Sequence, residues 1–181
     1  MSKKTVDVIK SIVVLAVICL VISGALAVVN SFTAPVIETA AAERENQARQ
    51  SVLPEAASFE KLEQAPLPEG VVSGYQGVDS AGQTAGYVFT VEGKGFDGII
   101  SVMCAIGTDG NIIKCSTLDV SSETKTLGGK TANPDYTDQY TGQDSSLEGV
   151  DSISGATITS TAYKGCVEQA FAAYELVKEA E

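Results

Sequence analysis

The segment GIISVMCAIGTDGNIIKCSTLDV, residues 98–120, decides the fold because it holds two β-rich runs around one turn signal. The runs are Gly98–Ile106 and Ile112–Val120, and the polar residues Thr108–Asn111 separate them. An Asp-Gly pair between two such runs is a strong signal of a β-hairpin. This segment therefore predicts an antiparallel β-hairpin.

Two cysteines lie on the two runs. If Asp109 and Gly110 form a two-residue turn, Cys104 faces Cys115 across the hairpin. A disulfide is then geometrically possible, and a pair of small buried thiols is the other interpretation. The chain has no C-x-x-C pair and no His. This excludes a zinc ribbon, a thioredoxin-like motif, and nucleophile or metal sites that depend on His.

Further strands and one long helix are predicted around the hairpin. Val71–Val78 and Ala85–Val91 predict two more strands, and residues 54–70, with three prolines, predict a connecting loop. Residues 121–150 are polar and Gly-rich, which indicates irregular structure with a short helix around Asp135–Tyr140. In Thr159–Lys178 apolar residues recur at i, i+3 and i+4, which is typical of a helix that packs on a sheet. Without an internal repeat, this order predicts an α+β fold with an antiparallel sheet.

The N-terminal segment is apolar enough to cross a membrane. Ile12–Val29 contains 18 residues without a charge. Such a helix, at about 1.5 Å per residue, just spans a hydrocarbon core of about 30 Å. Lys3, Lys4 and Lys10 precede it and favour a cytoplasmic N-terminus, with the rest of the chain outside the cytoplasm. A cleavable signal peptide that ends near residues 25–27 is the alternative interpretation.

A second helical segment is predicted after the apolar one. Thr33–Pro35 indicates that a helix ends or that a new one begins, because proline suits the first helical position. Residues 36–53 alternate apolar and charged side chains and predict a stalk or docking helix. The sequence therefore predicts a transmembrane anchor at 1–30, a helical stalk and linker at 31–70, and one domain at 71–181.

The charge balance excludes one class of partner. Lys and Arg number 12, whereas Asp and Glu number 23, so the formal net charge is −11. Beyond residue 10 the chain carries 9 basic and 22 acidic residues, a balance of −13. Nucleic-acid binding and polybasic attachment to a membrane surface both need a basic footprint. We therefore expect no nucleic-acid partner.

One glycine motif is misleading. Gly93–Gly98 matches the letters of G-x-G-x-x-G, the dinucleotide-binding fingerprint. That fingerprint needs a helix directly after it, so that the helix N-terminus meets the pyrophosphate. Ile99–Val102 follows here and predicts a strand. We expect a Gly-rich turn rather than a dinucleotide site.

Two polar segments are candidates for ligand binding. In Glu123–Lys130 two adjacent glycines allow backbone N–H groups to approach a planar or anionic ligand, and Lys130 could supply charge; a flexible connection is the alternative. Asp151–Thr157 precedes the C-terminal helix, where free N–H groups and the helix dipole favour an anion. Gly155 permits a bend that presents the Thr157 hydroxyl. The simpler interpretation is a Ser/Thr-rich helix cap.

The second of these segments carries a family resemblance. Asp151–Thr157, with the pattern D-x-x-S-G-A-T, resembles the flavinylation motif of the FMN-binding domain found in the G subunit of Rnf complexes and in the C subunit of the sodium-pumping NADH:quinone reductase. Glu123–Gly128 is similar to that family's Glu-Thr-Pro-Gly-Leu-Gly loop, but it lacks Pro-Gly. Lys94–Gly98 and Tyr136–Tyr140 are similar to two further segments. The matching order of segments covers essentially the whole chain, and the short length is closer to the Rnf protein.

The resemblance implies a covalent cofactor. In that family the last Thr of the motif, Thr157 here, carries FMN through a phosphoester that a flavin transferase installs. It implies no catalytic acid or base and no metal site. The other residues expected to contact the cofactor are Ser154, Gly155, Ala156 and Thr159 in the motif and helix, and Glu123, Thr124, Leu127, Gly128 and Lys130 in the loop.

The resemblance also implies a place of action. The N-terminal helix is retained as a membrane anchor, and the FMN domain lies on the extracytoplasmic side. The partners are the integral and peripheral subunits of an Rnf-type ferredoxin:NAD⁺ oxidoreductase that moves Na⁺ or H⁺. In such a complex the chain transfers electrons and turns over no substrate by itself.

Two other functions remain open. A non-redox, membrane-anchored structural or adhesion module also accounts for an apolar helix followed by a β-rich head. An FMN domain of a stand-alone extracytoplasmic reductase would keep the cofactor without the complex. Flavin fluorescence that survives a denaturing gel would favour a flavoprotein, and co-purification with integral membrane proteins would count against a stand-alone reductase.

Overall fold

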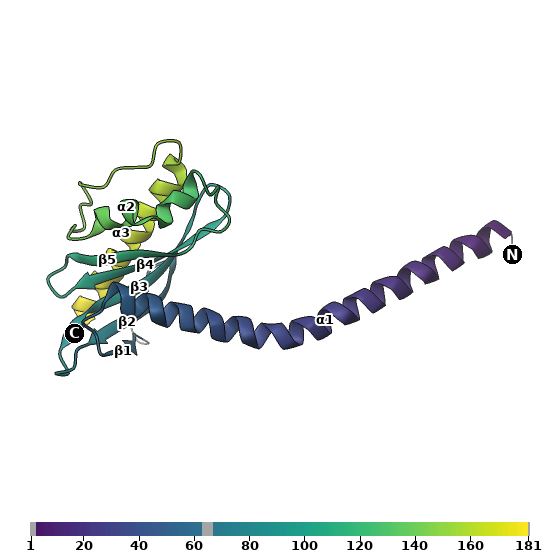
Figure 1. Ribbon diagram of the computed structural model, residues 1–181, viewed down its shortest axis with the longest axis horizontal. Helices are drawn as coiled ribbons and strands as arrows, with labels where there is room; N and C mark the ends of the chain where they lie inside the picture. Colours follow the sequence, from purple (N-terminus) through teal and green to yellow (C-terminus); the bar gives the residue numbers. More distant parts are fainter. Residues whose placement is uncertain (1–2, 63–66, 181) are drawn as a thin grey trace. The chain divides into compact units, whose positions relative to one another are not determined.

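The computed structural model describes residues 3–62 and 67–180, and the chain divides into two compact units. Residues 1–44 form the first unit and residues 45–181 the second. The first unit contains most of helix α1. The second contains the last turns of that helix, a five-stranded sheet, several short helices and the C-terminal helix α3 (Figure 1).

Helix α1, Lys3–Val52, is continuous through Pro35. The predicted interruption at Thr33–Pro35 is therefore wrong. Proline lacks an N–H and removes a single backbone hydrogen bond from the helix. The hydroxyls of Thr33 and Thr39 donate to backbone carbonyls one turn earlier, at 3.0 and 2.9 Å. The residues that follow are mainly Ala, Glu, Arg and Gln, which favour a helix and allow it to continue.

The apolar part of α1 meets the requirements for a membrane span. From Ile12 onward the helix contains a window of 18 residues with a mean hydropathy of 3.2, and none of that window is buried inside the structure. An isolated helix that exposes only apolar side chains is unfavourable in water. By length and composition this part of α1 can cross a bilayer.

The sheet is an antiparallel meander. Its strands are β1 Ser58–Lys61, β2 Val71–Val78, β3 Thr84–Lys94, β4 Ile99–Gly107 and β5 Ile112–Asp119. Their order in the sheet follows their order in the chain. The four strands from β2 to β5 were predicted, and this arrangement confirms the α+β class.

Strand β1 corrects the prediction of a plain loop at residues 54–70. It pairs with β2 from Ser58 opposite Val78 to Lys61 opposite Tyr75. The strand has only four residues, and most of them are exposed. Such a short edge strand shows no alternation of apolar and polar residues, and this is why the sequence did not reveal it.

The β4–β5 hairpin pairs the two cysteines as predicted, but its turn is one residue longer than predicted. Cys104 pairs with Cys115, as predicted. The Gly107 N–H donates to the Asn111 carbonyl at 2.8 Å, so three residues rather than two lie inside that hydrogen bond. A register shift just beyond Ala105 compensates for the additional residue.

Cys104 and Cys115 are free thiols whose Sγ atoms lie 3.4 Å apart. Each residue is 1% exposed. Burial raises the pKa of Cys115 well above its usual range, so the thiol is neutral. Of the two interpretations of this pair, the structure shows the small buried thiols.

One face of the sheet is covered by α3, Thr157–Ala180, at the predicted helix (Figure 1). Its buried stripe includes Tyr163, Val167 and Phe171, which pack against apolar side chains of β3 and β4. The short helices η1, α2 and η2 contribute to the same core, with Tyr136 and Tyr140 fully or nearly buried. Their bounds are Gly128–Ala132, Pro134–Thr137 and Asp138–Tyr140.

The last turns of α1 cover the opposite face. Val52 and Leu53 pack there with Val88 of β3 and Met103 of β4, and all four are 0% exposed. Alternate residues of β3 and β4 therefore point into two separate cores, as expected for a sheet buried on both faces.

Arg49 fixes these last turns of α1 to β2. It is 7% exposed, its guanidinium lies 3.8 Å from the centroid of the Tyr75 ring, and it forms an ion pair with Glu45 at 3.4 Å. The Ser73 hydroxyl donates to the same Glu45 oxygen at 3.3 Å. The ring and the carboxylate replace part of the hydration that the buried cation loses.

Two neighbouring isoleucines of β4 test the assigned burial at the start of the strand. Ile100 is 0% exposed and Ile99 is 55% exposed. We expect Ile100→Ala to lower the free energy of unfolding by about 2–5 kcal/mol, because it leaves a cavity in a packed core. Ile99→Ala should lower it by less than about 1 kcal/mol. Urea denaturation of both variants, followed by circular dichroism, measures the difference; equal losses would contradict the assigned burial of the two side chains.

Candidate functional site

The turn before α3 is held in a defined bend. Gly155 has a φ of +78°, a conformation that only glycine adopts without strain. The Ala156 N–H donates to the Ile153 carbonyl at 2.9 Å, and the Ser160 N–H donates to the Ala156 carbonyl at 2.9 Å. Ala156 therefore occupies the N-cap position, and Thr157 begins the helix.

The start of α3 has no side-chain cap among the described residues. Ala156 has no side-chain oxygen, and the Ser160 hydroxyl instead accepts a hydrogen bond from the Ile153 N–H at 3.1 Å. The N–H groups of the first helical turn therefore keep their capacity to bind an acceptor. This arrangement does not support the interpretation as a Ser/Thr helix cap. It favours an anion site at the helix N-terminus.

The segment that leads into this turn is anchored by the short helices. The Asp151 N–H donates to the Gln139 side-chain oxygen at 2.9 Å. The Tyr136 hydroxyl donates to the Ser160 carbonyl at 3.3 Å and lies 3.0 Å from the Tyr140 hydroxyl. The segment Tyr136–Tyr140, which is similar to a second family motif, thus supports the bend.

Glu123 joins three segments. It is 5% exposed. Its Oε2 accepts from the Thr159 hydroxyl at 2.7 Å, and its Oε1 accepts from the Asp97 N–H at 3.0 Å. Thr159 belongs to the first turn of α3, and Asp97 to the turn between β3 and β4. One carboxylate therefore connects that turn, the helix and its own loop.

The environment of Glu123 keeps it ionised. Burial raises the pKa of Glu123, but hydrogen bonds from the Thr159 hydroxyl and from the backbone N–H groups of residues 96–98 lower it by more. The pKa therefore lies below its usual value of 4.5.

Two glycines allow the segments to approach this carboxylate. A Cβ on Gly95 would collide with Glu123, and a Cβ on Gly128 would collide with Glu123 and lie 2.7 Å from the Thr159 hydroxyl oxygen. Gly95 also begins the turn to β4, where its N–H donates to the Gly98 carbonyl at 2.8 Å. The G-x-G-x-x-G letters thus form a Gly-rich turn between two strands, as predicted, with no helix after it.

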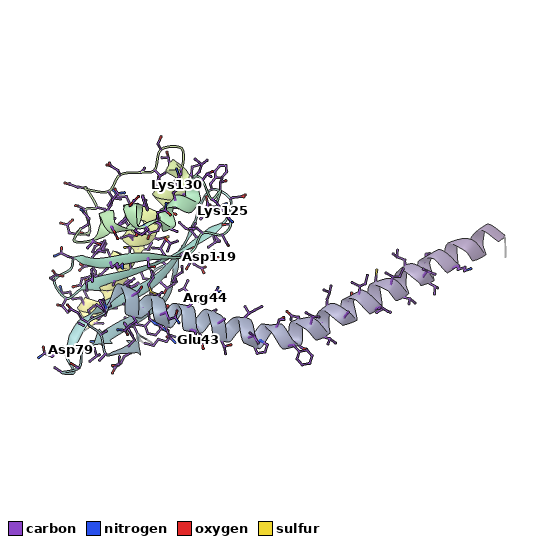
Figure 2. The ribbon with its side chains drawn as sticks, in the orientation of Figure 1. Glu43, Arg44, Asp79, Asp119, Lys125 and Lys130 are labelled. Carbon is purple, nitrogen blue, oxygen red and sulfur yellow. The ribbon has the colours of Figure 1, made fainter. Side chains whose placement is uncertain are left out.

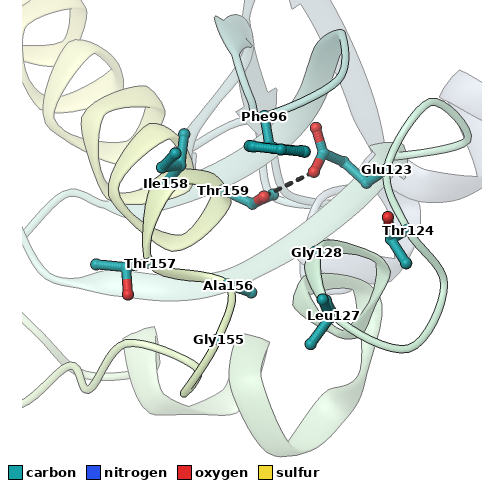
Figure 3. A pocket seen from close by; sticks show the side chains of 10 residues that line it. All are labelled: Phe96, Glu123, Thr124, Leu127, Gly128, Gly155, Ala156, Thr157, Ile158 and Thr159. Atoms are coloured by element: carbon teal, nitrogen blue, oxygen red, sulfur yellow. Dashed lines mark hydrogen bonds between the residues drawn. The ribbon is translucent and has the colours of Figure 1, made fainter.

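These segments enclose a cavity of about 320 Å³ (Figure 3). That volume lies at the lower end of the range for ligand sites, about 300–1,000 Å³. Eight of the ten predicted site residues line it: Glu123, Thr124, Leu127, Gly128, Gly155, Ala156, Thr157 and Thr159. The structure therefore brings together two segments that are far apart in the sequence.

The other two predicted residues lie elsewhere. Ser154 and Lys130 are exposed and do not line the cavity. Lys125 and Lys130 belong to the segment that follows β5 (Figure 2). The N–H groups of Leu127 and Lys130 donate within the loop, to the carbonyls of Thr124 and Leu127. Lys130 therefore supplies no charge inside the cavity, and these two N–H groups of the loop are engaged within it.

Two apolar residues of the cavity were missed from the sequence. Phe96 comes from the β3–β4 turn and Ile158 from the first turn of α3. They are 67% and 57% exposed, and Leu127, which they accompany, is 43% exposed. Exposed aromatic and aliphatic side chains around a cavity are typical of a site that binds an apolar ring. Their adjacency to Gly95 and Thr157 was the only signal in the sequence.

The cavity has two different ends. The helix N-terminus, beside the exposed Thr157, is electropositive. The other end holds the buried Glu123 carboxylate beneath apolar side chains. Among the described residues, no group of three or more His, Cys, Asp or Glu is placed to hold a metal ion. The arrangement suits a ligand with an anionic group at one end and a flat apolar group at the other.

Comparison with known proteins gives concordant findings. A family model described as FMN-binding domain matches residues 95–172. The chain is 33% identical over 166 residues to the G subunit of the ion-translocating oxidoreductase complex of Methanosarcina acetivorans, across 86% of this chain and 88% of that protein. It is 33% identical over 187 residues to the G subunit of the Na⁺-translocating ferredoxin:NAD⁺ oxidoreductase complex of Acetobacterium woodii, across 90% and 89%.

A solved structure is also similar. The crystal structure of Shewanella oneidensis NqrC aligns with a TM-score of 0.49 and 19% sequence identity. The alignment covers 66% of this chain and 67% of that one.

The close approach at Gly128 predicts a loss of stability. We expect Gly128→Ala to lower the free energy of unfolding by about 1–3 kcal/mol, because the added methyl group collides with Glu123 and Thr159. Gly165→Ala is the matched control, since a Cβ there meets open space. On a helix it should stabilise by up to about 1 kcal/mol. Urea denaturation distinguishes the two, and a neutral Gly128→Ala would refute the packing.

The ionisation of Glu123 predicts a dependence on pH. A pKa that is lower in the folded state stabilises the fold above the usual carboxyl value, and this stabilisation is lost as pH falls through the folded-state pKa. We expect the difference in unfolding free energy between the wild type and Glu123→Gln to be largest near pH 7 and to shrink toward about pH 3. Urea titrations across this range measure it. A free-energy difference that does not change with pH would show that the charge of Glu123 does not contribute to stability.

Proposed function

The chain belongs to the family of G subunits of ion-translocating oxidoreductase (Rnf) complexes, and on this premise we propose that it is an electron-transfer flavoprotein that binds FMN in the cavity of Figure 3. Electron transfer within such a complex needs a cofactor whose position is fixed by the protein. The chain supplies a cavity for that purpose, built on a sheet and a 24-residue helix.

The residues of the cavity fit FMN. The uncapped N-terminus of α3 suits a phosphate group, because free N–H groups and the helix dipole both favour an anion. Phe96, Leu127 and Ile158 suit a flat ring, and their side chains would shield it from water. Gly128 leaves room where any side chain would fill the space beside Thr159.

The finer proposal is that FMN is attached to the Thr157 hydroxyl through a phosphoester. One observation carries it: Thr157 is exposed and begins an uncapped helix directly beside the cavity. A phosphoester at this hydroxyl would lie next to the free N–H groups of the first turn. A flavin transferase would form the bond between the FMN phosphorus and the threonine oxygen by breaking the pyrophosphate bond of FAD, so that AMP leaves and the hydroxyl proton is released.

The bound flavin would supply the redox chemistry, and this chain's residues would orient and shield it. Thr157 would hold the phosphate end. Phe96, Leu127 and Ile158 would restrict the movement of the ring and exclude water from it. A covalent link keeps the local concentration of the cofactor constant, even where free flavin is scarce.

We propose the following organisation in the membrane. Residues 1–30 anchor the chain, residues 31–70 form a stalk and linker that also contributes an edge strand, and residues 71–181 form the FMN domain. The N-terminal lysines favour a cytoplasmic N-terminus, which puts the FMN domain on the extracytoplasmic side. The partners are the other subunits of an Rnf-type complex, and in this arrangement the chain passes electrons between them.

Intact mass tests the attachment. Protein purified from a host with an active flavin transferase should be heavier than its chain by one FMN phosphoester. Thr157→Ala should lack this increment. Thr161→Ala is the matched control, because it removes an exposed hydroxyl of the same helix that does not line the cavity.

An unmodified wild type under these conditions would refute the covalent attachment, and a purified protein that also lacks flavin absorbance would refute the flavoprotein. A Thr157→Ala variant that keeps the increment would refute the attachment residue alone, and peptide mapping would then locate the flavin.

Protease accessibility tests the orientation. Protease added to intact spheroplasts should digest the FMN domain, because that domain faces outward in this proposal. In inverted membrane vesicles the domain should be protected. The reverse pattern would place the domain in the cytoplasm and contradict the positive-inside assignment.

A further inference from the structure

The Glu123 carboxylate is enclosed by hydrogen-bond donors. The Asp97 N–H, which cannot accept, lies 3.0 Å from Oε1, and the Thr159 hydroxyl lies 2.7 Å from Oε2. A neutral carboxyl group would need an acceptor for its own proton, whereas an ionised one uses both oxygens as acceptors. The Thr159 hydroxyl can also accept a hydrogen bond, but the Asp97 N–H cannot, and together with the N–H groups of residues 96 and 98 it favours the carboxylate form.

No cation neutralises this charge directly. Among the described residues the only ion pair within 4.0 Å joins Arg49 to Glu45, on the other face of the sheet. Lys125 and Lys130 are exposed and do not line the cavity. The compensation comes from N–H and hydroxyl dipoles alone. Because Glu123 is 5% exposed, water screens its field less than at the surface.

We infer that Glu123 is a positioning residue that also sets the potential of the site: its buried negative charge at the cavity wall lowers the reduction potential of the flavin held there. This inference rests on the proposed function. Reduction adds electrons to the ring, and a fixed negative charge nearby makes that addition less favourable. The loop that carries Glu123 thus opposes reduction rather than assisting it.

The surrounding hydrogen bonds support the direction of this effect. Several backbone N–H groups of the segments around the cavity are already engaged by other acceptors. Those of the β3–β4 turn point to Glu123, and those of Leu127 and Gly129 donate to the Thr124 carbonyl. The positive end of the α3 dipole lies at Thr157. There the proposed phosphate would neutralise it, so the dipole would stabilise the phosphate rather than the ring.

The test compares reduction potentials of the full chain, purified from membranes with its flavin. Glu123→Gln removes the charge and keeps the side-chain length. We expect its potential to shift to a more positive value than that of the wild type. Glu123→Asp keeps the charge and should remain closer to the wild type. Asp97→Asn is the matched control, because it removes an exposed carboxylate from the adjacent turn and should shift the potential less.

Intact mass, measured first, separates this inference from the proposed function. A wild type without flavin refutes the proposed function. Flavin-loaded Glu123→Gln whose potential is equal to or lower than that of the wild type overturns the inference. If Glu123→Gln does not fold, Thr159→Val decides: it removes one donor from the carboxylate, so the potential should shift to a more negative value. An unchanged or more positive value overturns the inference.

Discussion

The burial of one helical stripe against strands β3 and β4 governs this domain. Tyr163, Val167 and Phe171 of α3 pack on β3 and β4, and this packing determines where the N-terminus of the helix lies. The cavity forms at that N-terminus, where three chain segments meet around Glu123. Thr159 is held by the carboxylate, so the exposed Thr157, two residues earlier, is positioned although no hydrogen bond within the described residues holds its own hydroxyl. An exposed hydroxyl that has a defined position and no hydrogen-bond partner is well suited to modification.

Much of the fold was evident in the sequence because periodicity records burial. In β4 the side chains of Ile100, Val102 and Cys104 alternate with others on the opposite face, and in α3 the buried residues recur every three or four positions. Both patterns arise from side chains that contact a core, so they persist without knowledge of the partner element. The family resemblance, rather than any pattern, indicated that two distant segments form one site.

The remaining features depend on contacts between residues that are remote in the chain. Glu123 and Thr159 are separated by 36 positions, and nothing near either residue predicts their hydrogen bond. Gly95 looked like part of a nucleotide motif, whereas its actual constraint is the proximity of a carboxylate. Lys130 was assigned by charge alone, and it does not line the cavity. The continuous helix through Pro35 and the short strand β1 were missed because local signals for breaks and loops are weak against tertiary packing and helix propensity.

The burial of the paired thiols of the hairpin determines when they can be oxidised. Cys104 and Cys115 are opposite each other, yet solvent reaches only 1% of either residue. An oxidant can join them only while the sheet is unformed or briefly open. The pair is therefore oxidised in a molecule that met an oxidant before its core had folded, and reduced in a molecule whose core folded first. Once α3 has packed against this core, the oxidation state of the pair stays unchanged until the domain opens again.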